Sequence, residues 1–175
     1  KKKKKKKKKK KISSITIDMP KYGVQLCGSP IEQKRNPQSP VDAQFSGCFA
    51  VALALTEQRA DMTTFTGALD KGLSDEFKRL MSITNIEQAD DLDAIHPEFW
   101  PGRVKMIIDG DEVELYGKHM RGERERPMTI EEVQDKFRDL SPKHDEKNRK
   151  EVFDVINNLE NASIDDLLVP LRKSS

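Results

Sequence analysis

Residues 36–55 read Asn36-Pro-Gln-Ser-Pro-Val-Asp-Ala-Gln-Phe-Ser-Gly-Cys-Phe-Ala-Val-Ala-Leu-Ala-Leu55 and join a polar loop to an apolar helix. Ser39 suits the N-cap of that helix, Pro40 suits its first position, and the carboxylate of Asp42 can bond back to the cap. Apolar residues from Val41 to Leu55 fall on every side of a 3.6-residue period. We therefore expect one core helix that the rest of the protein covers all round. Small side chains recur along it at helical spacing, namely Ala43, Gly47, Ala50 and Ala54.

The chain begins with an unbroken lysine run at residues 1–11. Adjacent like charges repel one another and bury little, so we expect a disordered tail. Such a tail can bind nucleic acid or an anionic membrane, although an engineered tag or a stand-in sequence is the favoured interpretation. Removing its eleven lysines from the 32 basic residues leaves 21 against 30 acidic ones, a formal net charge of −9 for residues 12–175. The charge balance therefore favours neither a specific nucleic-acid partner nor a membrane.

Residues 12–175 are enough for one domain with one core, although hydrophobic residues make up only 35% of the chain. No stretch approaches the roughly 20 apolar residues that a membrane-spanning helix needs. Cys27 and Cys48 have neither a metal-ligand spacing nor a CxxC motif, which favours a reducing cytoplasm. We therefore expect a soluble cytoplasmic chain.

Metal-ligand and catalytic patterns are sparse. The histidines are scattered, and the aspartates of the acidic loop lack the spacing of a calcium-binding loop, so we expect neither a metal nor a cofactor. His96 lies in His-Pro-Glu-Phe-Trp-Pro, which we interpret as a packing loop because no Cys, Ser or carboxylate partner is placed beside it. His119 and His144 lie in or next to charged stretches and are predicted to be exposed.

Periodicity and capping signals predict the remaining elements. Alternating apolar residues predict strands at residues 15–19, 83–87, 103–109 and 112–119, the last two joined by the Asp109-Gly110 turn of an antiparallel hairpin. Capped amphipathic patterns predict helices at residues 74–81, 129–140, 146–159 and 163–171. Ser74 is the expected cap of the first of these helices, with Phe77, Leu80 and Met81 facing inward. In the second helix we expect a capping box between Thr129 and Glu132 and one buried stripe, made of Ile130, Val133, Phe137 and Leu140. The order indicates an α+β fold, with an antiparallel sheet, packed helices and a helical C-terminal end.

Three of these segments together resemble the C-terminal part of the MmgE/PrpD family, which includes 2-methylcitrate dehydratase, cis-aconitate decarboxylase and iminodisuccinate epimerase. They are Ser39-Pro-Val-Asp-Ala-Gln-Phe-Ser46 running into Ala50–Leu55, the Asp109-Gly110 hairpin, and Pro127-Met-Thr-Ile-Glu-Glu-Val-Gln-Asp-Lys-Phe-Arg-Asp-Leu140. The resemblance implies that residues 12–175 form a small lid domain, and that the large helical domain of the intact, homodimeric enzyme is absent from this chain. It also implies a cofactor-independent active site between the two domains, with most catalytic residues in the absent one. The catalytic residues of the enzyme are therefore unknown from this chain.

The substrates of that family are small di- and tricarboxylates, so the lid has to help bind an anion. Lys34 and Arg35 precede the core helix, and Gln44 and Ser46 lie in its first turns, where free amides and the helix dipole favour negative charge. We predict that these residues and Phe49 form the lid side of a carboxylate pocket. The alternative is a solvated basic loop beside a structural helix.

The chain departs from the family pattern at three places. Phe49 stands where the family usually has Tyr, Gly47-Cys48 replace an apolar-Pro pair, and Gln58 stands where Gly is common. Losing a phenolic hydroxyl removes a possible proton donor.

The resemblance predicts a hydro-lyase that dehydrates 2-methylcitrate or a related tricarboxylate, and we expect the isolated chain to be inactive. One alternative is a non-catalytic α+β binding module that the lysine run attaches to nucleic acid or an anionic membrane. Another is a truncated gene product without activity.

Overall fold

The computed structural model describes residues 11–59 and 61–172, which belong to two units that divide between Arg126 and Pro127. Residues 12–175 are thus divided between two units. The sequence predicted one domain with terminal helices for the same range. The predicted disordered tail lies outside the described residues except for Lys11. The backbone of Lys11 pairs with Asp109, donating its N–H to the carboxylate and accepting the Asp109 N–H at its carbonyl, both at 2.9 Å.

A four-stranded sheet with the order β2-β1-β3-β4 is the frame of the first unit. Its strands are β1 (Ile12–Met19), β2 (Thr84–Gln88), β3 (Gly102–Ile108) and β4 (Asp111–Gly117). β3 pairs antiparallel with β1 and with β4, as the hairpin signal predicted, whereas β1 and β2 run parallel. The sheet is therefore mixed, because the long connection from β1 to β2 allows a parallel return.

The β3–β4 hairpin turns where the sequence predicted it. Asp109 and Gly110 both adopt positive φ, at 55° and 96°. Two such residues are typical of the turn whose twist matches that of the flanking strands. The short turn fixes the register of the hairpin, in which Met106 pairs with Val113 and Val104 with Leu115.

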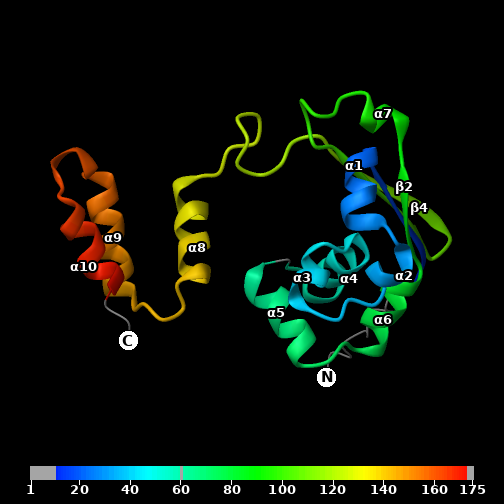
Figure 1. The fold of residues 1–175 in the computed structure, drawn as a ribbon, viewed down its shortest axis with the longest axis horizontal. Coiled ribbons are helices and arrows are strands. Elements are labelled where there is room, and N and C mark those ends of the chain that lie inside the picture. The colour runs from blue at the N-terminus through cyan, green and yellow to red at the C-terminus, as the bar shows by residue number, and fades with distance from the viewer. Residues whose placement is uncertain (1–10, 60, 173–175) are drawn as a thin grey trace, which may run out of the picture. The chain divides into compact units, whose positions relative to one another are not determined.

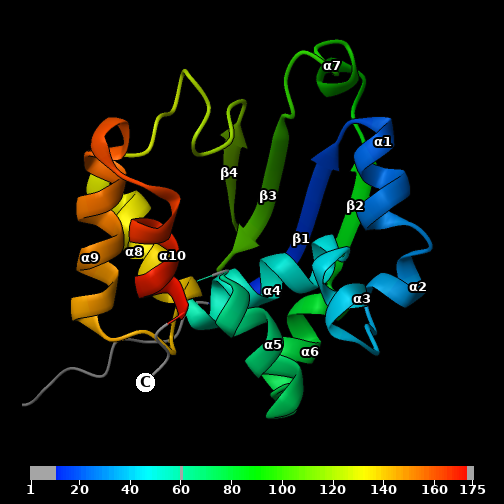
Figure 2. The same ribbon diagram turned by 60° about the vertical axis from the view of Figure 1, so that its left-hand side comes forward.

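Helices gather on one side of the sheet (Figure 1). They are α1 (Lys21–Gly23), a π-helical segment (Val24–Gly28), α2 (Ile31–Lys34), α3 (Pro40–Gln44), α4 (Gly47–Glu57), α5 (Met62–Asp70) and α6 (Asp75–Ser82). The short α7 (Asp90–Asp93) lies in the connection from β2 to β3, beyond the end of β2 (Figure 1 and Figure 2). α6 begins at its predicted cap, Ser74, and buries the three predicted side chains, Phe77, Leu80 and Met81. The segment between β1 and Pro37 showed no period in the sequence, and it forms short helical pieces instead.

The predicted core helix is two helices rather than one. Phe45 leaves the helical conformation (φ −98°, ψ 29°), Ser46 is extended, and a second helix begins at Gly47. The hydroxyl of Ser46 caps this second helix, so one serine ends the first run and begins the next. The expectation that the whole segment is covered is wrong at its start, because Val41 is 61% and Phe45 is 42% exposed.

α4 provides the centre of the core. Phe49 is fully buried, with its ring centroid 5.5 Å from that of Phe65 and 4.9 Å from that of Phe77. Gly47 lies so close to the sheet that an added Cβ would stand 2.9 Å from Cδ1 of Ile86. The small residue at this position therefore lets α4 approach β2, as the predicted stripe of small side chains required.

The opposite face of the sheet carries a charged cluster. The carboxylate of Asp18 is almost fully buried and accepts from Arg103 Nε and Lys105 Nζ, both at 2.8 Å. Arg103 also pairs with Asp91. Burial raises the pKa of Asp18, but the hydrogen bonds and charges of Lys105 and Arg103 outweigh it and hold this pKa below its ordinary value. The cluster ties β1 to β3.

The second unit consists of α8 (Ile130–Leu140), α9 (Glu146–Asn157), a 3₁₀ turn (Leu159–Asn161) and α10 (Ile164–Arg172). The predicted capping box between Thr129 and Glu132 is present. Phe137 of α8 meets Phe153 of α9 edge to face, with centroids 5.2 Å apart. The predicted buried stripe of α8 is largely exposed within the described chain, since Ile130 is 66% accessible. Among residues 11–59 and 61–172, no helix combines the length and apolar character that a bilayer crossing requires.

Candidate functional site

A surface pocket of about 570 Å³ opens in the first unit beside α2 and α3, which Figure 2 labels. Its lining comes from the end of α2, the following turn and α3, namely Glu32, Gln33, Lys34, Asn36, Gln38, Val41, Asp42 and Phe45. Val41 and Phe45 give it an apolar wall. Lys34 is the one cationic side chain of this lining, and two carboxylates share the pocket with it.

Lys34 is the predicted site residue that the structure places in this pocket. Its ammonium group donates to the carbonyl of Leu26 at 2.7 Å, which fixes the side chain across the π-helical segment. An ammonium has three donors, and within the described residues the structure gives the Lys34 ammonium this one hydrogen bond.

Arg35 points away from the pocket and toward the sheet. Its Nη2 donates to the carbonyl of Thr84 at 2.8 Å and to Oδ1 of Asn85 at 2.7 Å, and its Nε donates to the same Thr84 carbonyl at 3.2 Å. These bonds anchor the turn after α2 to the start of β2. Arg35 therefore has a structural task in this chain, whatever charge it adds to the surroundings of the site.

Ser46 and Phe49 are buried, and Gln44 is exposed at the end of α3 without lining the pocket. Ser46 is 1% accessible, and its hydroxyl donates to the carbonyl of Lys34 while accepting the N–H of Phe49 at 3.0 Å. The same hydroxyl thus begins α4 and holds the backbone of the pocket lysine. The substrate role predicted for these three residues stays a prediction.

The two thiols next to this region are poor nucleophiles. Burial raises the pKa of Cys48, and the nearby charge of Arg35 opposes that shift only in part. Burial likewise raises the pKa of Cys27 against the charge of Lys34. Both thiols are therefore protonated at neutral pH, whereas the reactive form of a cysteine is the deprotonated thiolate.

The lining of the pocket could contact part of a ligand, but it does not form a complete catalytic site. The lining holds one ammonium together with the carboxylates of Glu32 and Asp42, and the Asp42 carboxylate accepts the backbone N–H of Gln38 at 3.2 Å. A tricarboxylate needs more positive charge than this lining supplies.

The histidines are more enclosed than the sequence indicated. His96 stacks on Tyr22 and meets Trp100 edge to face at a centroid distance of 4.8 Å, so its loop packs as predicted. His144 and His119 were predicted to be exposed, and both are partly buried. His144 Nε2 lies 2.8 Å from the carbonyl oxygen of Leu171, because the charged stretch around it packs against α10.

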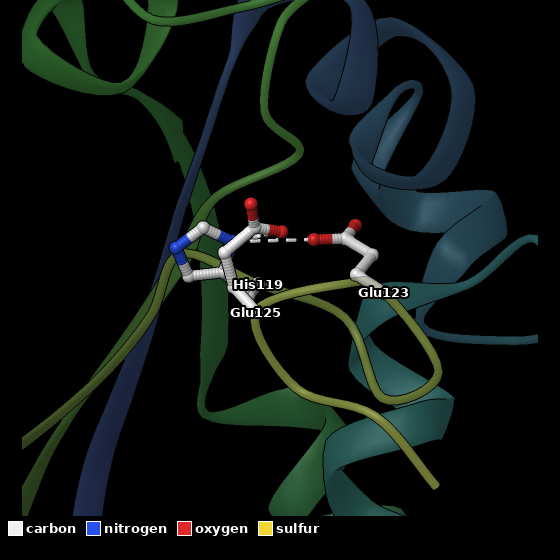
Figure 3. Close-up of side chains that lie close together, drawn as sticks. All are labelled: His119, Glu123 and Glu125. Carbon is white, nitrogen blue, oxygen red and sulfur yellow. Dashed lines mark hydrogen bonds and ion pairs between the residues drawn. The ribbon is translucent and has the colours of Figure 1, made fainter.

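A group of side chains with metal-ligand chemistry lies in the loop after β4. His119, Glu123 and Glu125 bring one imidazole and two carboxylates together there (Figure 3). The sequence interpretation missed the group, because the spacing of these residues matches no familiar metal motif. Their convergence depends on how the loop folds.

Comparison with protein families gives one match. The model of the MmgE/PrpD C-terminal domain matches residues 1–161 of the 175. No curated protein matches the chain. The match spans the core helices, the sheet and most of the second unit, and it covers the three segments that carried the resemblance. The chain therefore belongs to the MmgE/PrpD family and carries its C-terminal domain.

Proposed function

We propose that this chain is the lid part of a cofactor-independent lyase that dehydrates a small tricarboxylate, 2-methylcitrate or a close relative. The observation that carries the proposal is the family match over residues 1–161, which supports a lyase- or dehydratase-type role. The pocket beside α2 and α3 supports a contribution to anion binding, because its ammonium group is held in place by the chain itself.

In such a dehydration a base removes the proton next to a carboxylate while an acid assists the departure of hydroxide. Fixed cations lower the barrier by offsetting the negative charge that develops. We assign Lys34 to this electrostatic task at the lid side of the site. The acid, the base and further cations come from the large helical domain, so the isolated chain is inactive. The intact enzyme acts as a homodimer in the cytoplasm.

The other predicted residues act on the site through Lys34. Ser46 holds the backbone carbonyl of Lys34, and Arg35 holds the adjoining turn on β2. Phe49 supports the same turn from the core, where its backbone N–H donates to the hydroxyl oxygen of Ser46. Gln44 is exposed next to the pocket residue Phe45 and remains a candidate for direct contact with substrate.

The test uses the chain joined to the large helical domain of an MmgE/PrpD enzyme. Replacing Lys34 with Met keeps the length of the side chain and removes the charge. A charge-assisted hydrogen bond contributes about 1.5–3 kcal/mol, which corresponds to a rise of roughly 10–100-fold in KM for the tricarboxylate. Lys78→Met is the matched control, since Lys78 is exposed on α6 and lies outside the pocket. Equal KM values for the two variants would remove Lys34 from the substrate site.

A further inference from the structure

The loop after β4 places three potential ligand atoms within reach of one ion. Nδ1 of His119 lies 3.3 Å from Oε2 of Glu123 and 3.8 Å from Oε2 of Glu125. The ligand atoms of the three residues all lie within 4.8 Å of one another. Figure 3 shows both carboxylates turned toward the imidazole.

These separations are close to those around a tetrahedral cation. Zinc binds imidazole nitrogen at about 2.0–2.1 Å and carboxylate oxygen at about 2.0–2.2 Å, so two ligands of one tetrahedral zinc ion stand about 3.4 Å apart. The nitrogen-to-oxygen distances of 3.3 and 3.8 Å bracket that value. The two carboxylate oxygens lie within 4.8 Å of each other, and Glu125 is the exposed member of the group.

The loop itself holds the ligands in position. Gly122 adopts a φ of 99°, and its N–H donates to the carbonyl of Arg126 at 2.8 Å. The N–H of Glu123 donates to the carbonyl of Met120, and the N–H of Arg126 donates to the carbonyl of Glu123. These bonds close the backbone into a compact turn. A glycine at the positive-φ position lets the chain reverse so that both glutamates face His119.

The imidazole is also oriented by packing. The ring of His119 meets that of Phe99 edge to face at 5.3 Å, and Lys118 Nζ lies over the Phe99 ring at 3.8 Å from its centroid. The ammonium of Lys118 is thus engaged by the aromatic ring beside the histidine. The side chains of His119 and Glu123 are about a quarter exposed (25% and 28%), so a cation entering from solvent meets partly desolvated ligands.

We propose that His119, Glu123 and Glu125 bind a divalent transition-metal cation, with Zn²⁺ as the ion that fits best. An imidazole with two carboxylates suits a borderline cation, whereas Ca²⁺ and Mg²⁺ prefer sites made of oxygen alone. The two carboxylates balance the charge of the ion, and three protein ligands leave one position for water. The proposal rests on the geometry of this loop and is independent of the lyase activity.

The test is titration of the full chain with Zn²⁺ in a competition with a chromophoric chelator. The proposal predicts saturable binding of one ion per chain. Glu123→Gln and His119→Gln are each expected to weaken binding by at least about 10-fold, as loss of a ligand or of its orientation does in metal sites. Glu112→Gln on β4 and His144→Gln in the second unit are the matched controls and are expected to bind as the wild type does.

A second measurement keeps the result independent of variant folding. In the ¹H–¹⁵N spectrum of the wild-type chain, Zn²⁺ is expected to shift the amides of residues 117–126 before any others. Shifts centred elsewhere would overturn the proposal, as would wild-type chain that does not bind Zn²⁺. Equal affinity of the two ligand variants and their controls would also overturn it.

Discussion

We predict that the Ser46 side chain contributes more to the free energy of unfolding than the side chain of an ordinary helix N-cap does. Its hydroxyl accepts the N–H of Phe49 at the start of α4 and donates to the carbonyl of Lys34, and the residue is 1% accessible. Ser46→Ala removes the cap, at about 0.5–2 kcal/mol, and leaves a partly buried carbonyl unpaired, at about 1–3 kcal/mol. We expect a loss of about 2–4 kcal/mol in the free energy of unfolding, since the two effects share one side chain and are not fully additive.

Ser39→Ala is the matched control for this prediction. Ser39 caps α3 by accepting the N–H of Asp42 at 3.1 Å, but it is only partly buried, and within the described residues its hydroxyl makes no second bond of the same kind. Its loss is expected to cost about 0.5–1 kcal/mol. The comparison therefore separates the cap from the buried link to the pocket lysine.

Urea unfolding followed by the fluorescence of Trp100 measures both variants. Trp100 is the single tryptophan of the chain, and it contacts Tyr22 and His96 within the first unit, so its emission reports the unfolding of that unit. With a slope of about 2 kcal/mol per molar urea, the middle of the usual range, Ser46→Ala is expected to lower the midpoint by about 1–2 M. A Ser46→Ala loss within about 0.5 kcal/mol of the Ser39→Ala loss would refute the reasoning, because the error of such comparisons is of that size.

Three further substitutions test other parts of the fold by the same unfolding measurement. Asp18→Asn is expected to cost about 1–3 kcal/mol at pH 7, since it leaves two basic partners without their buried carboxylate. Because the folded pKa of Asp18 is depressed, its stabilisation is complete above the ordinary pKa of about 3.9 and is lost as pH falls through the lower folded value. The difference between wild type and variant should therefore shrink below about pH 4, and a constant difference would contradict this assignment. Gln58→Gly is expected to stabilise by about 0.5–1 kcal/mol, because Gln58 ends α4 with a φ of 55° that glycine adopts without strain; a destabilised variant would show that the side chain matters instead. Gly28→Ala is expected to destabilise by about 1–3 kcal/mol, because its Cβ would stand 2.6 Å from Cγ2 of Ile86, and unchanged stability would mean that the core yields there.

Local signals in the sequence predicted the elements that depend on neighbouring residues. Ser39, Ser74 and Thr129 all cap helices as expected, since a short side chain bonds amides only three positions away. The Asp109-Gly110 turn is equally local. Alternation placed the strands, because one face of the sheet is apolar and the other is polar.

Features that depend on tertiary structure could not be predicted from local sequence signals. The break at Ser46 is hidden within an apolar run, and only the bond from its hydroxyl to the Lys34 carbonyl shows why the chain turns there. The parallel pairing of β1 with β2 joins residues about 70 positions apart in register, for example Ile15 with Thr84. No periodicity reports such a pairing.

The candidate site likewise combines features that local sequence signals predicted with features that depend on tertiary structure. The charge of Lys34 beside a helix start was visible in the sequence, and the structure places this residue in a pocket. The direction of Arg35 was not visible, because the carbonyl of Thr84 that holds it comes from a distant strand. The convergence of His119 with Glu123 and Glu125 likewise depends on a backbone turn at Gly122.

A dehydration assay with 2-methylcitrate tests whether this chain is the lid part of a tricarboxylate lyase. It compares this chain alone, the large helical domain of an MmgE/PrpD enzyme alone, and a stable complex or fusion of the two. We expect turnover by the combined protein and by neither part separately, because our proposal assigns the acid–base groups and the lid-side cation to different domains. Turnover by the isolated chain, or a folded combined protein that neither binds nor dehydrates a tricarboxylate, would contradict it.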